Sequence, residues 1–329
     1  MRTYNILFLL PLRSLIRLAV LFIVYFILSS CSHSDRSIRI VFAGDMMLDR
    51  GTRTVIEQKC IDHLFENVTS LFHQQDIVMV NFENPFCTNT EIASNKLYCF
   101  RGDPDWLFEI KKAGITHAVF ANNHIGDYGR EGLKETMAYL SRNDIHFAGS
   151  DSSFLDPCKP LLIDKKGSRI AIFSNSLLYQ KDNPGFANEN FPQLNKRISS
   201  FKKLHPDYCI IISLHWGIEM DDFPTAEQKR QAHELIKAGA DLIIGHHPHV
   251  VQPIEMYEGK YICYSLGNFM FDTNKDPGNK GILACFVITD NKISLDKIIP
   301  FTLIDSKPFI MNEKDSHQFL EKKGIYFDN

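Results

Sequence analysis

The chain has 329 residues, of which 44% are hydrophobic and 23% are charged, and its formal net charge is -3. This composition is that of an ordinary globular protein and excludes a disordered or low-complexity chain. The near-neutral charge and the lack of a long Lys/Arg run exclude the electrostatic footprint of a nucleic-acid-binding protein, so we expect no nucleic-acid partner.

The N-terminus has the pattern of a secretory signal. Three arginines lead into an uncharged apolar run at 18–28, which is shorter than the roughly 20 residues that a membrane-spanning helix needs. The following Leu28-Ser29-Ser30-Cys31 resembles the lipobox of bacterial lipoproteins, in which the cysteine is acylated and becomes the new N-terminus. An uncleaved anchor helix is the alternative. In both cases we expect the body of the protein to be extracytoplasmic, in the cell envelope and held to a membrane.

This pattern predicts how the chain is divided. We expect a lipoprotein-type signal peptide at 1–31, a polar tether at 32–37, one domain at 38–305 and a polar C-terminal tail at 306–329. Seven cysteines follow Cys31, so at least one thiol is unpaired in an oxidising compartment. Cys87 and Cys99 flank a polar loop, and their spacing alone leaves open whether they pair.

Along the domain, β-type runs repeatedly end in side chains that can carry chemistry. Helices are expected between these runs, among them one near 61–73. The segment 86–102 is expected to be a polar loop that lines one side of a cleft, and the segment 179–192 reads as a long loop or lid. The predicted strands and the groups that follow them are 38–43 with Asp45, 76–80 with Asn81 and Glu83, 116–121 with Asn123 and His124, 209–214 with His215, and 241–244 with His246, His247 and His249.

Carboxylates, an amide and several imidazoles at strand ends form the mixed ligand set that Mn, Fe or Zn sites use. In open α/β sheets, ligands bind at the carboxyl ends of the strands. Pro248 stiffens the backbone between His247 and His249. The alternatives are a surface histidine cluster without a metal and, for Asp45, a carboxylate that only caps a turn. A G-x-S-x-G elbow, a P-loop and a dinucleotide glycine motif are all absent from the sequence.

Six motifs in a fixed order resemble the CapA family of bacterial capsule or poly-γ-glutamate synthesis proteins over residues 38 to 300. The motifs are Gly44-Asp45-Met46-Met47-Leu48-Asp49-Arg50, Asn81-Phe82-Glu83-Asn84-Pro85, Ala121-Asn122-Asn123-His124, His215-Trp216-Gly217-x-Glu219, the stretch from Gly239 to His249, and Tyr264-Ser265-Leu266-Gly267-Asn268-Phe269. The family is similar in fold to the calcineurin-like metallophosphoesterases. The resemblance therefore implies a four-layer α/β/β/α sandwich.

The resemblance also implies roles for individual residues. The implied metal ligands are Asp45, Glu83, Asn123, His215, His247 and His249. His124 would be the general acid or a phosphate contact, working with Asn123 and Asp45, and the residues that shape the pocket would be Asn81, Arg50, His246, Glu219 and Asn268. Metallophosphoesterases open with Asp-x-His, but Met47 stands at that position here, so the cofactor is expected to be one or two divalent ions.

Two functions from different classes fit this pattern. The first is a membrane-anchored, metal-dependent hydrolase that cleaves a phosphoester or amide bond of an anionic envelope polymer or its precursor. The second is a non-catalytic component that binds the polymer during assembly or export. The ligand set and His124 favour the enzyme, because a binder of polyanions uses mainly Arg and Lys. The expected partners are the polymer or its precursor, the membrane through Cys31, and other capsule-synthesis membrane proteins.

Overall fold

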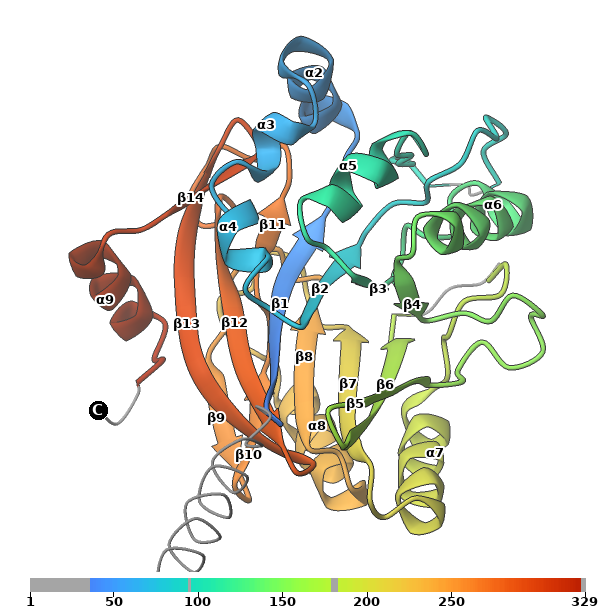
Figure 1. Ribbon diagram of the computed structural model, residues 1–329, viewed down its shortest axis with the longest axis vertical. Coiled ribbons are helices and arrows are strands. Elements are labelled where there is room, and N and C mark those ends of the chain that lie inside the picture. Colours follow the sequence, from blue (N-terminus) through green and yellow to red (C-terminus); the bar gives the residue numbers. More distant parts are fainter. Residues whose placement is uncertain (1–35, 94–95, 179–182, 327–329) are drawn as a thin grey trace, which may run out of the picture. The chain divides into compact units, whose positions relative to one another are not determined.

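The computed structural model describes residues 36–93, 96–178 and 183–326 (Figure 1). The predicted signal peptide and Cys31 lie outside these residues. Ser37–Asn329 forms one compact unit. Within the described ranges, no helix is both long enough and apolar enough to cross a membrane.

The unit alternates strands and helices through most of its length. The strands are β1 (Ile38–Met46), β2 (Ile77–Phe82), β3 (His117–Val119), β4 (His146–Ala148), β5 (Leu161–Lys165), β6 (Ser168–Ser176), β7 (Cys209–His215), β8 (Leu242–His246), β9 (Ile254–Tyr257), β10 (Lys260–Cys263), β11 (Asn268–Met270), β12 (Lys280–Thr289), β13 (Lys292–Ile304) and β14 (Lys307–Ile310). The helices are α2 (Arg50–Lys59), α3 (Asp62–Phe65), α4 (Thr69–Phe72), α5 (Trp106–Lys112), α6 (Gly129–Arg142), α7 (Phe191–Leu204), α8 (Ala226–Ala238) and α9 (Glu313–Lys322).

The strands form two sheets. The first has eight strands in the order β14-β13-β12-β1-β2-β3-β4, and β11 pairs with β1 outside this path. The second has six strands in the order β5-β6-β7-β8-β10-β9. In the first sheet β1 is parallel to β2, and in the second β7 is parallel to β8, so the carboxyl ends of the central strands lie at one edge of each sheet. In Figure 1 the arrowheads of β1, β7 and β8 all point upward.

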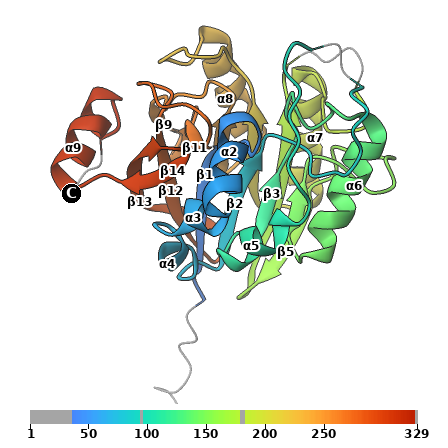
Figure 2. The same cartoon turned by 90° about the horizontal axis from the view of Figure 1, so that it is seen from above.

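Alternating side chains divide the interior into three apolar layers. On β1, Ile38, Ile40 and Phe42 face the second sheet, where they pack with residues such as Ile211 and Ile244. The alternate residues of β1 face outward and pack under α2 to α6. The outer face of the second sheet packs against α7 and α8. Figures 1 and 2 show helices on the outer side of both sheets. The expected four-layer α/β/β/α sandwich is thus confirmed.

Some elements differ from those predicted. The helix expected near 61–73 is two short helices, α3 and α4, and α7 begins at the end of the predicted lid. The C-terminal tail at 306–329 is not featureless: it contains β14, which extends the first sheet, and α9, whose Asn312 cap accepts from the backbone N–H of Asp315. Both elements are short and polar, so their hydrophobic pattern is weak.

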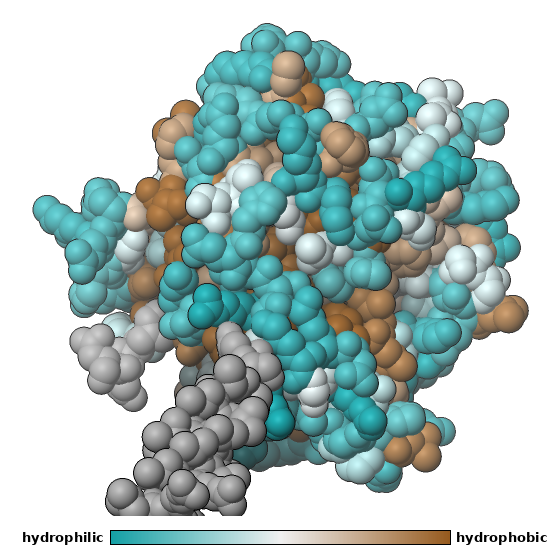
Figure 3. Space-filling model, viewed as in Figure 1, coloured by the Kyte–Doolittle hydropathy of each residue, from teal (hydrophilic) through white to brown (hydrophobic). Residues whose placement is uncertain are grey.

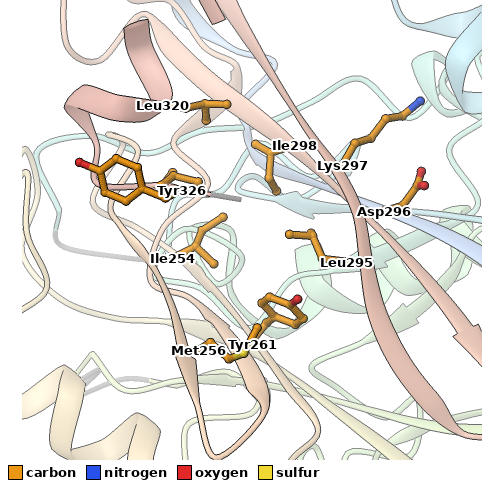
Figure 4. Close-up of a pocket in the computed structure, with 10 residues that line it drawn as sticks. Ile254, Met256, Tyr261, Leu295, Asp296, Lys297, Ile298, Leu320 and Tyr326 are labelled. Carbon is orange, nitrogen blue, oxygen red and sulfur yellow. The ribbon is translucent and has the colours of Figure 1, made fainter. Parts of the chain in front are cut away.

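A pocket of about 470 Å³ opens between the β9–β10 hairpin, β13 and the segment that follows α9. Figure 4 shows apolar side chains from these elements, including Ile254, Leu295 and Tyr326, around it. None of the predicted site residues lines this pocket. The face of the molecule seen in Figure 3 is mostly hydrophilic, with apolar residues between the polar ones.

Candidate metal centre

The two sheets bring the predicted ligands together at their carboxyl ends. Three overlapping groups place their ligand atoms within 4.8 Å of one another. The groups are Glu83 with His215 and His247, Asp45 with Glu83 and His249, and Glu219 with His247 and His249. The carboxylates Asp45 and Glu83 come from the first sheet and the imidazoles from the second, so the site lies across the junction of the two sheets.

Two glycines make this junction possible. A Cβ on Gly44 would lie 1.8 Å from the backbone oxygen of Gly267, and a Cβ on Gly245 would lie 1.9 Å from that of Tyr264. The segment from Tyr264 to Gly267 therefore passes directly against both strands. It accepts a hydrogen bond from the backbone N–H of Asp45 (3.0 Å) and donates one to the carbonyl of Gly245 (3.3 Å). The Tyr-Ser-Leu-Gly-Asn-Phe motif thus joins the two sheets beneath the site.

Asp45 is fully buried and contacts groups from both sheets. Its Oδ1 accepts a hydrogen bond from Asn81 (2.8 Å) and lies 3.1 Å from Nδ1 of His246, while its Oδ2 accepts one from the backbone N–H of His247 (3.1 Å). Burial raises the pKa of Asp45, but these contacts and His249 lower it by more, so it stays below the usual value. The carboxylate is therefore ionised and ready to hold a cation.

Glu83 is also fully buried, but its carboxylate lacks hydrogen bonds. Neither oxygen has a partner among the residues that the structure describes. The nearest imidazole nitrogens, Nε2 of His215 and Nε2 of His249, lie 3.6 Å from Oε1, beyond hydrogen-bond distance. Burial, followed by the negative charges of Asp45 and Glu219, raises the pKa of Glu83 well above 4.5.

The imidazoles of His215 and His247 are held in the neutral form that binds metals. Burial lowers the pKa of His215 well below its usual value and that of His247 to about 4, and the neighbouring imidazoles act in the same direction. His247 and His249 have φ values of 98° and 57°, which non-glycine residues rarely adopt. Asn268 fixes His249, since its Oδ1 lies 2.8 Å from Nδ1, leaving Nε2 directed at Glu83.

The turn after β3 carries Asn123 and His124. The side-chain oxygen of Asn123 lies 2.8 Å from Nε2 of His215, so these two predicted ligands meet across the sheets. Asn122, to which the sequence assigned no role, holds the turn: its amide oxygen accepts the backbone N–H groups of His124 (3.0 Å) and Ile125 (2.9 Å). The sequence feature that could have indicated this role is the position of Asn122 at the end of the predicted strand, next to Asn123.

Asp127 is the residue that sequence reasoning missed. It is fully buried, and its Oδ2 lies 2.8 Å from Nδ1 of His124. The same carboxylate pairs with Lys96 (2.8 Å) and accepts the backbone N–H of Phe100 (2.9 Å). The predicted loop at 86–102 therefore does line the site. The His-x-x-Asp spacing, which places an acid three residues on in a tight turn, was the signal that could have identified it.

The remaining predicted pocket residues lie around the ligands. His246 is buried against Asp45, and its two ring nitrogens lack hydrogen-bond partners within the described ranges. Arg50 is half exposed, pairs with Asp272 (3.0 Å), and lies over the rings of Tyr98 and Phe100. Glu219 is exposed, on the loop that follows β7. Cys87 and Cys99, whose pairing the sequence left open, do not form a disulfide with each other.

Met47 is buried, and its sulfur accepts the backbone N–H of Asp49 at 3.1 Å. The position where metallophosphoesterases carry an imidazole therefore holds a thioether that is engaged in its own turn.

The residues present fit a divalent metal ion. A buried carboxylate without a hydrogen bond is strongly unfavourable unless a cation compensates it. Glu83 is such a group, and buried nitrogens of His215 and His247 also have no partner in the described part of the chain. Oxygen and nitrogen donors of this kind suit Mn, Fe or Zn. The cluster is thus built as a metal site would be.

Comparison with known proteins identifies the family. The chain is 31% identical to a Bacillus subtilis (strain 168) protein named PGA biosynthesis protein CapA, over 89% of this chain and 78% of the other. It is 28% identical to the capsule biosynthesis protein CapA of Bacillus anthracis, over 89% of this chain and 72% of the other.

Among solved structures, the fold resembles one described as a novel phosphatase from Mycoplasma pneumoniae. The TM-score is 0.50 at 17% identity, covering 87% of this chain and 99% of that one, which supports the fold alone. The family model for bacterial capsule synthesis protein PGA_cap matches residues 39–273. The chain therefore belongs to the PGA_cap family of bacterial capsule synthesis proteins.

Proposed function

We propose that this protein is a membrane-anchored, metal-dependent hydrolase, phosphoesterase-like in its chemistry, that acts in capsule or poly-γ-glutamate metabolism. The observation that carries the proposal is the buried, unpaired carboxylate of Glu83 among neutral imidazoles. The His124–Asp127 pair beside this cluster adds a group suited to proton transfer. The names of the Bacillus relatives support the biological setting.

A divalent ion, when bound, polarises a substrate oxygen and lowers the pKa of water enough to make it a nucleophile at neutral pH. The residues of the chain supply the rest. Asp127 holds Nδ1 of His124 and leaves Nε2 to exchange a proton. Burial lowers the pKa of His124, so the proton that Nε2 gives to the departing oxygen or nitrogen is one that it first takes up from water. Phe100 packs against the imidazole, with ring centroids 4.2 Å apart, and keeps water from that face.

The substrate we propose is an anionic envelope polymer or its precursor. Arg50 is half exposed and shares Phe100 with His124, so it is the cationic side chain that we expect to contact the substrate, which would have to displace Asp272 from it. A guanidinium in this position recognises phosphate or carboxylate groups by paired hydrogen bonds. The alternative is a non-catalytic component that binds the polymer during its assembly or export.

The test uses the full-length chain purified in mild detergent. Metal content is measured by mass spectrometry, and turnover is measured with bis(p-nitrophenyl) phosphate, p-nitrophenyl phosphate and poly-γ-glutamate in the presence of Mn²⁺ or Zn²⁺. We expect bound metal and turnover in the wild type, loss of both in Glu83→Ala and His247→Ala, and loss of turnover alone in His124→Ala. Metal without turnover on any probe favours the polymer-binding alternative, and no bound metal overturns the hydrolase.

We further propose that acylated Cys31 anchors the protein to the envelope membrane, where membrane proteins of capsule synthesis are its neighbours. Cys31→Ala should move the protein from the membrane fraction to the soluble fraction and abolish incorporation of a labelled fatty acid. Retention of the variant in the membrane fraction would instead support the uncleaved anchor helix.

A further inference from the structure

Glu219 lies beside the metal centre without a partner of its own. It is exposed, and its carboxylate makes no hydrogen bond or ion pair with any residue that the structure describes. One of its oxygens, however, lies within 4.8 Å of ring nitrogens of both His247 and His249. A carboxylate that approaches two imidazoles and no cation is unusual for a solvent-facing glutamate.

Two backbone hydrogen bonds place Glu219 close to His247 and His249. The backbone N–H of Trp216 donates to the carbonyl of His246 (3.1 Å), and that of Met220 donates to the carbonyl of Pro248 (2.8 Å). These two hydrogen bonds enclose Glu219 on its own loop and His247 on the histidine turn. The two segments are therefore fastened side by side.

The backbone of the loop that carries Glu219 also has a well-defined conformation. Gly217 has a φ of 90°, and a Cβ there would lie 2.6 Å from Nε2 of Gln228. Met220 has a φ of 62°, which is costly for a non-glycine residue. Beyond the loop, the side chain of Gln252 donates to the carbonyl of Asp221 (2.8 Å). Gly217 and Met220 stand on either side of Glu219 and fix the backbone conformation of its loop.

Three carboxylates, those of Asp45, Glu83 and Glu219, come together at the site. Asp45, Glu83 and Glu219, the site carboxylates, lie close enough together that the other two raise the pKa of Glu83. The cations at the rim are engaged elsewhere, since Arg50 pairs with Asp272 and Lys96 pairs with Asp127. Three carboxylates that meet at one site without a cation of their own are compensated when one or two divalent ions bind between them.

We propose that Glu219 is itself a metal ligand, closing from the solvent side onto an ion held by His247 and His249. It supplies the donor that Met47 does not, and so gives the site a third carboxylate in place of the missing imidazole. This inference rests on the metal dependence proposed above. It assigns Glu219 to the coordination sphere rather than to the wall of the pocket.

The probe is Co²⁺, whose visible absorption reports the number and type of its ligands. Affinity is measured by titration calorimetry, and coordination by the absorption spectrum of the full-length protein in detergent. The variants are Glu219→Gln, His247→Ala as a predicted ligand of the same cluster, and Glu57→Gln as a matched control on an exposed face of α2. Because Glu219 is exposed, Glu219→Gln is expected to fold normally, which circular dichroism checks.

We expect Glu219→Gln to weaken Co²⁺ binding about 10- to 100-fold and to change the absorption spectrum, while Glu57→Gln does neither. Weaker binding with an unchanged spectrum would mean that Glu219 acts only through its charge, and the inference would be wrong. Unchanged binding would overturn it as well. In both of these outcomes loss of Co²⁺ in His247→Ala still supports the metal site, whereas a wild type that binds no Co²⁺ removes the proposed function too.

Discussion

Replacing Glu83 by glutamine should have opposite effects on the metal-free and the metal-loaded protein. The carboxylate is fully buried, has no hydrogen-bond partner in the described structure, and has its pKa raised by burial and by neighbouring negative charge. Glutamine keeps the shape of the side chain and removes the charge. We therefore expect the variant to be more stable than the wild type when no metal is present.

The magnitude follows from linkage between protonation and folding. A carboxyl group whose pKa is raised on folding contributes stability that is complete below its unfolded pKa and is lost as the pH rises through the folded pKa. Between the ordinary glutamate pKa of 4.5 and the assay pH of 7.5, the loss of stability is at most about 4 kcal/mol, at about 1.4 kcal/mol per pH unit. The positive charge of Lys96 offsets part of it, so we expect Glu83→Gln to raise the metal-free unfolding free energy by about 1–3 kcal/mol.

Bound metal should reverse this order of stability, so that the wild type becomes more stable than Glu83→Gln. An ion present at 100 times its dissociation constant adds about 2.7 kcal/mol to the stability of a protein that binds it only when folded. The wild type should show this increase. Glu83→Gln should show little of it, because a carboxylate oxygen near three of the predicted ligands has been replaced by an amide.

The assay is urea unfolding at pH 7.5, followed by circular dichroism, in EDTA and in excess Zn²⁺ or Mn²⁺. Glu57→Gln serves as the control, since this exposed glutamate on α2 should change stability by less than about 0.5 kcal/mol. A variant less stable than the wild type in EDTA would refute the account of the buried charge. An unchanged metal-dependent increase would refute the assignment of Glu83 as a ligand.

Three further predictions follow from the structure. Gly245→Ala should lower the unfolding free energy by about 3 kcal/mol or more, because its Cβ would lie 1.9 Å from the backbone oxygen of Tyr264; thermal unfolding measures this, and a near-wild-type Tm would contradict it. Burial lowers the pKa of His117 to about 3, so its neutral form is favoured on folding and stability should fall as the pH drops below 6.5. The loss at pH 5 relative to pH 7.5 is about 2 kcal/mol, and His117→Asn should remove it in urea unfolding at the two pH values. Asp127→Asn should reduce turnover of bis(p-nitrophenyl) phosphate roughly 100-fold without changing metal content, because His124 loses its orientation; an unchanged kcat would leave Asp127 a purely structural role.

The central strands and their ligands could be predicted because each buried strand is a continuous β-branched run. In β7 and β8 every residue is buried, so the apolar run and its polar end are visible without tertiary information. Parallel strands then place those ends at one edge. The ligand positions of His215 and His247 follow from local sequence and this one rule of topology.

The elements that were missed are stabilised by contacts that the sequence does not display. β5 alternates between half-buried and exposed residues at the edge of its sheet, and β9 is a four-residue edge strand. α2 begins at Arg50 with Asp49 as its cap, but only two of its residues are buried, so its apolar face is narrow. Their positions depend on the neighbours they pack against.

The same distinction holds inside the site. The contact of Lys96 with Asp127 joins residues 31 positions apart through a loop without a regular pattern. The approach of Glu219 to the imidazoles depends on two backbone hydrogen bonds between separate turns. Neither contact has a periodic signal. Residue types at strand ends could be predicted, but the pairs that loops bring together could not.

The charge of the site bears on the choice between hydrolysis and polymer binding. Burial keeps the imidazoles of His215 and His247 neutral, and the rim cations Arg50 and Lys96 are already paired with carboxylates. A polyanion would be repelled by the carboxylates of this site unless divalent ions reverse their charge. Polymer binding would therefore need the same ions as hydrolysis, and a metal-dependent affinity for polymer would not separate the two. The residue that separates them is His124, because it is needed for proton transfer and is not one of the predicted ligands.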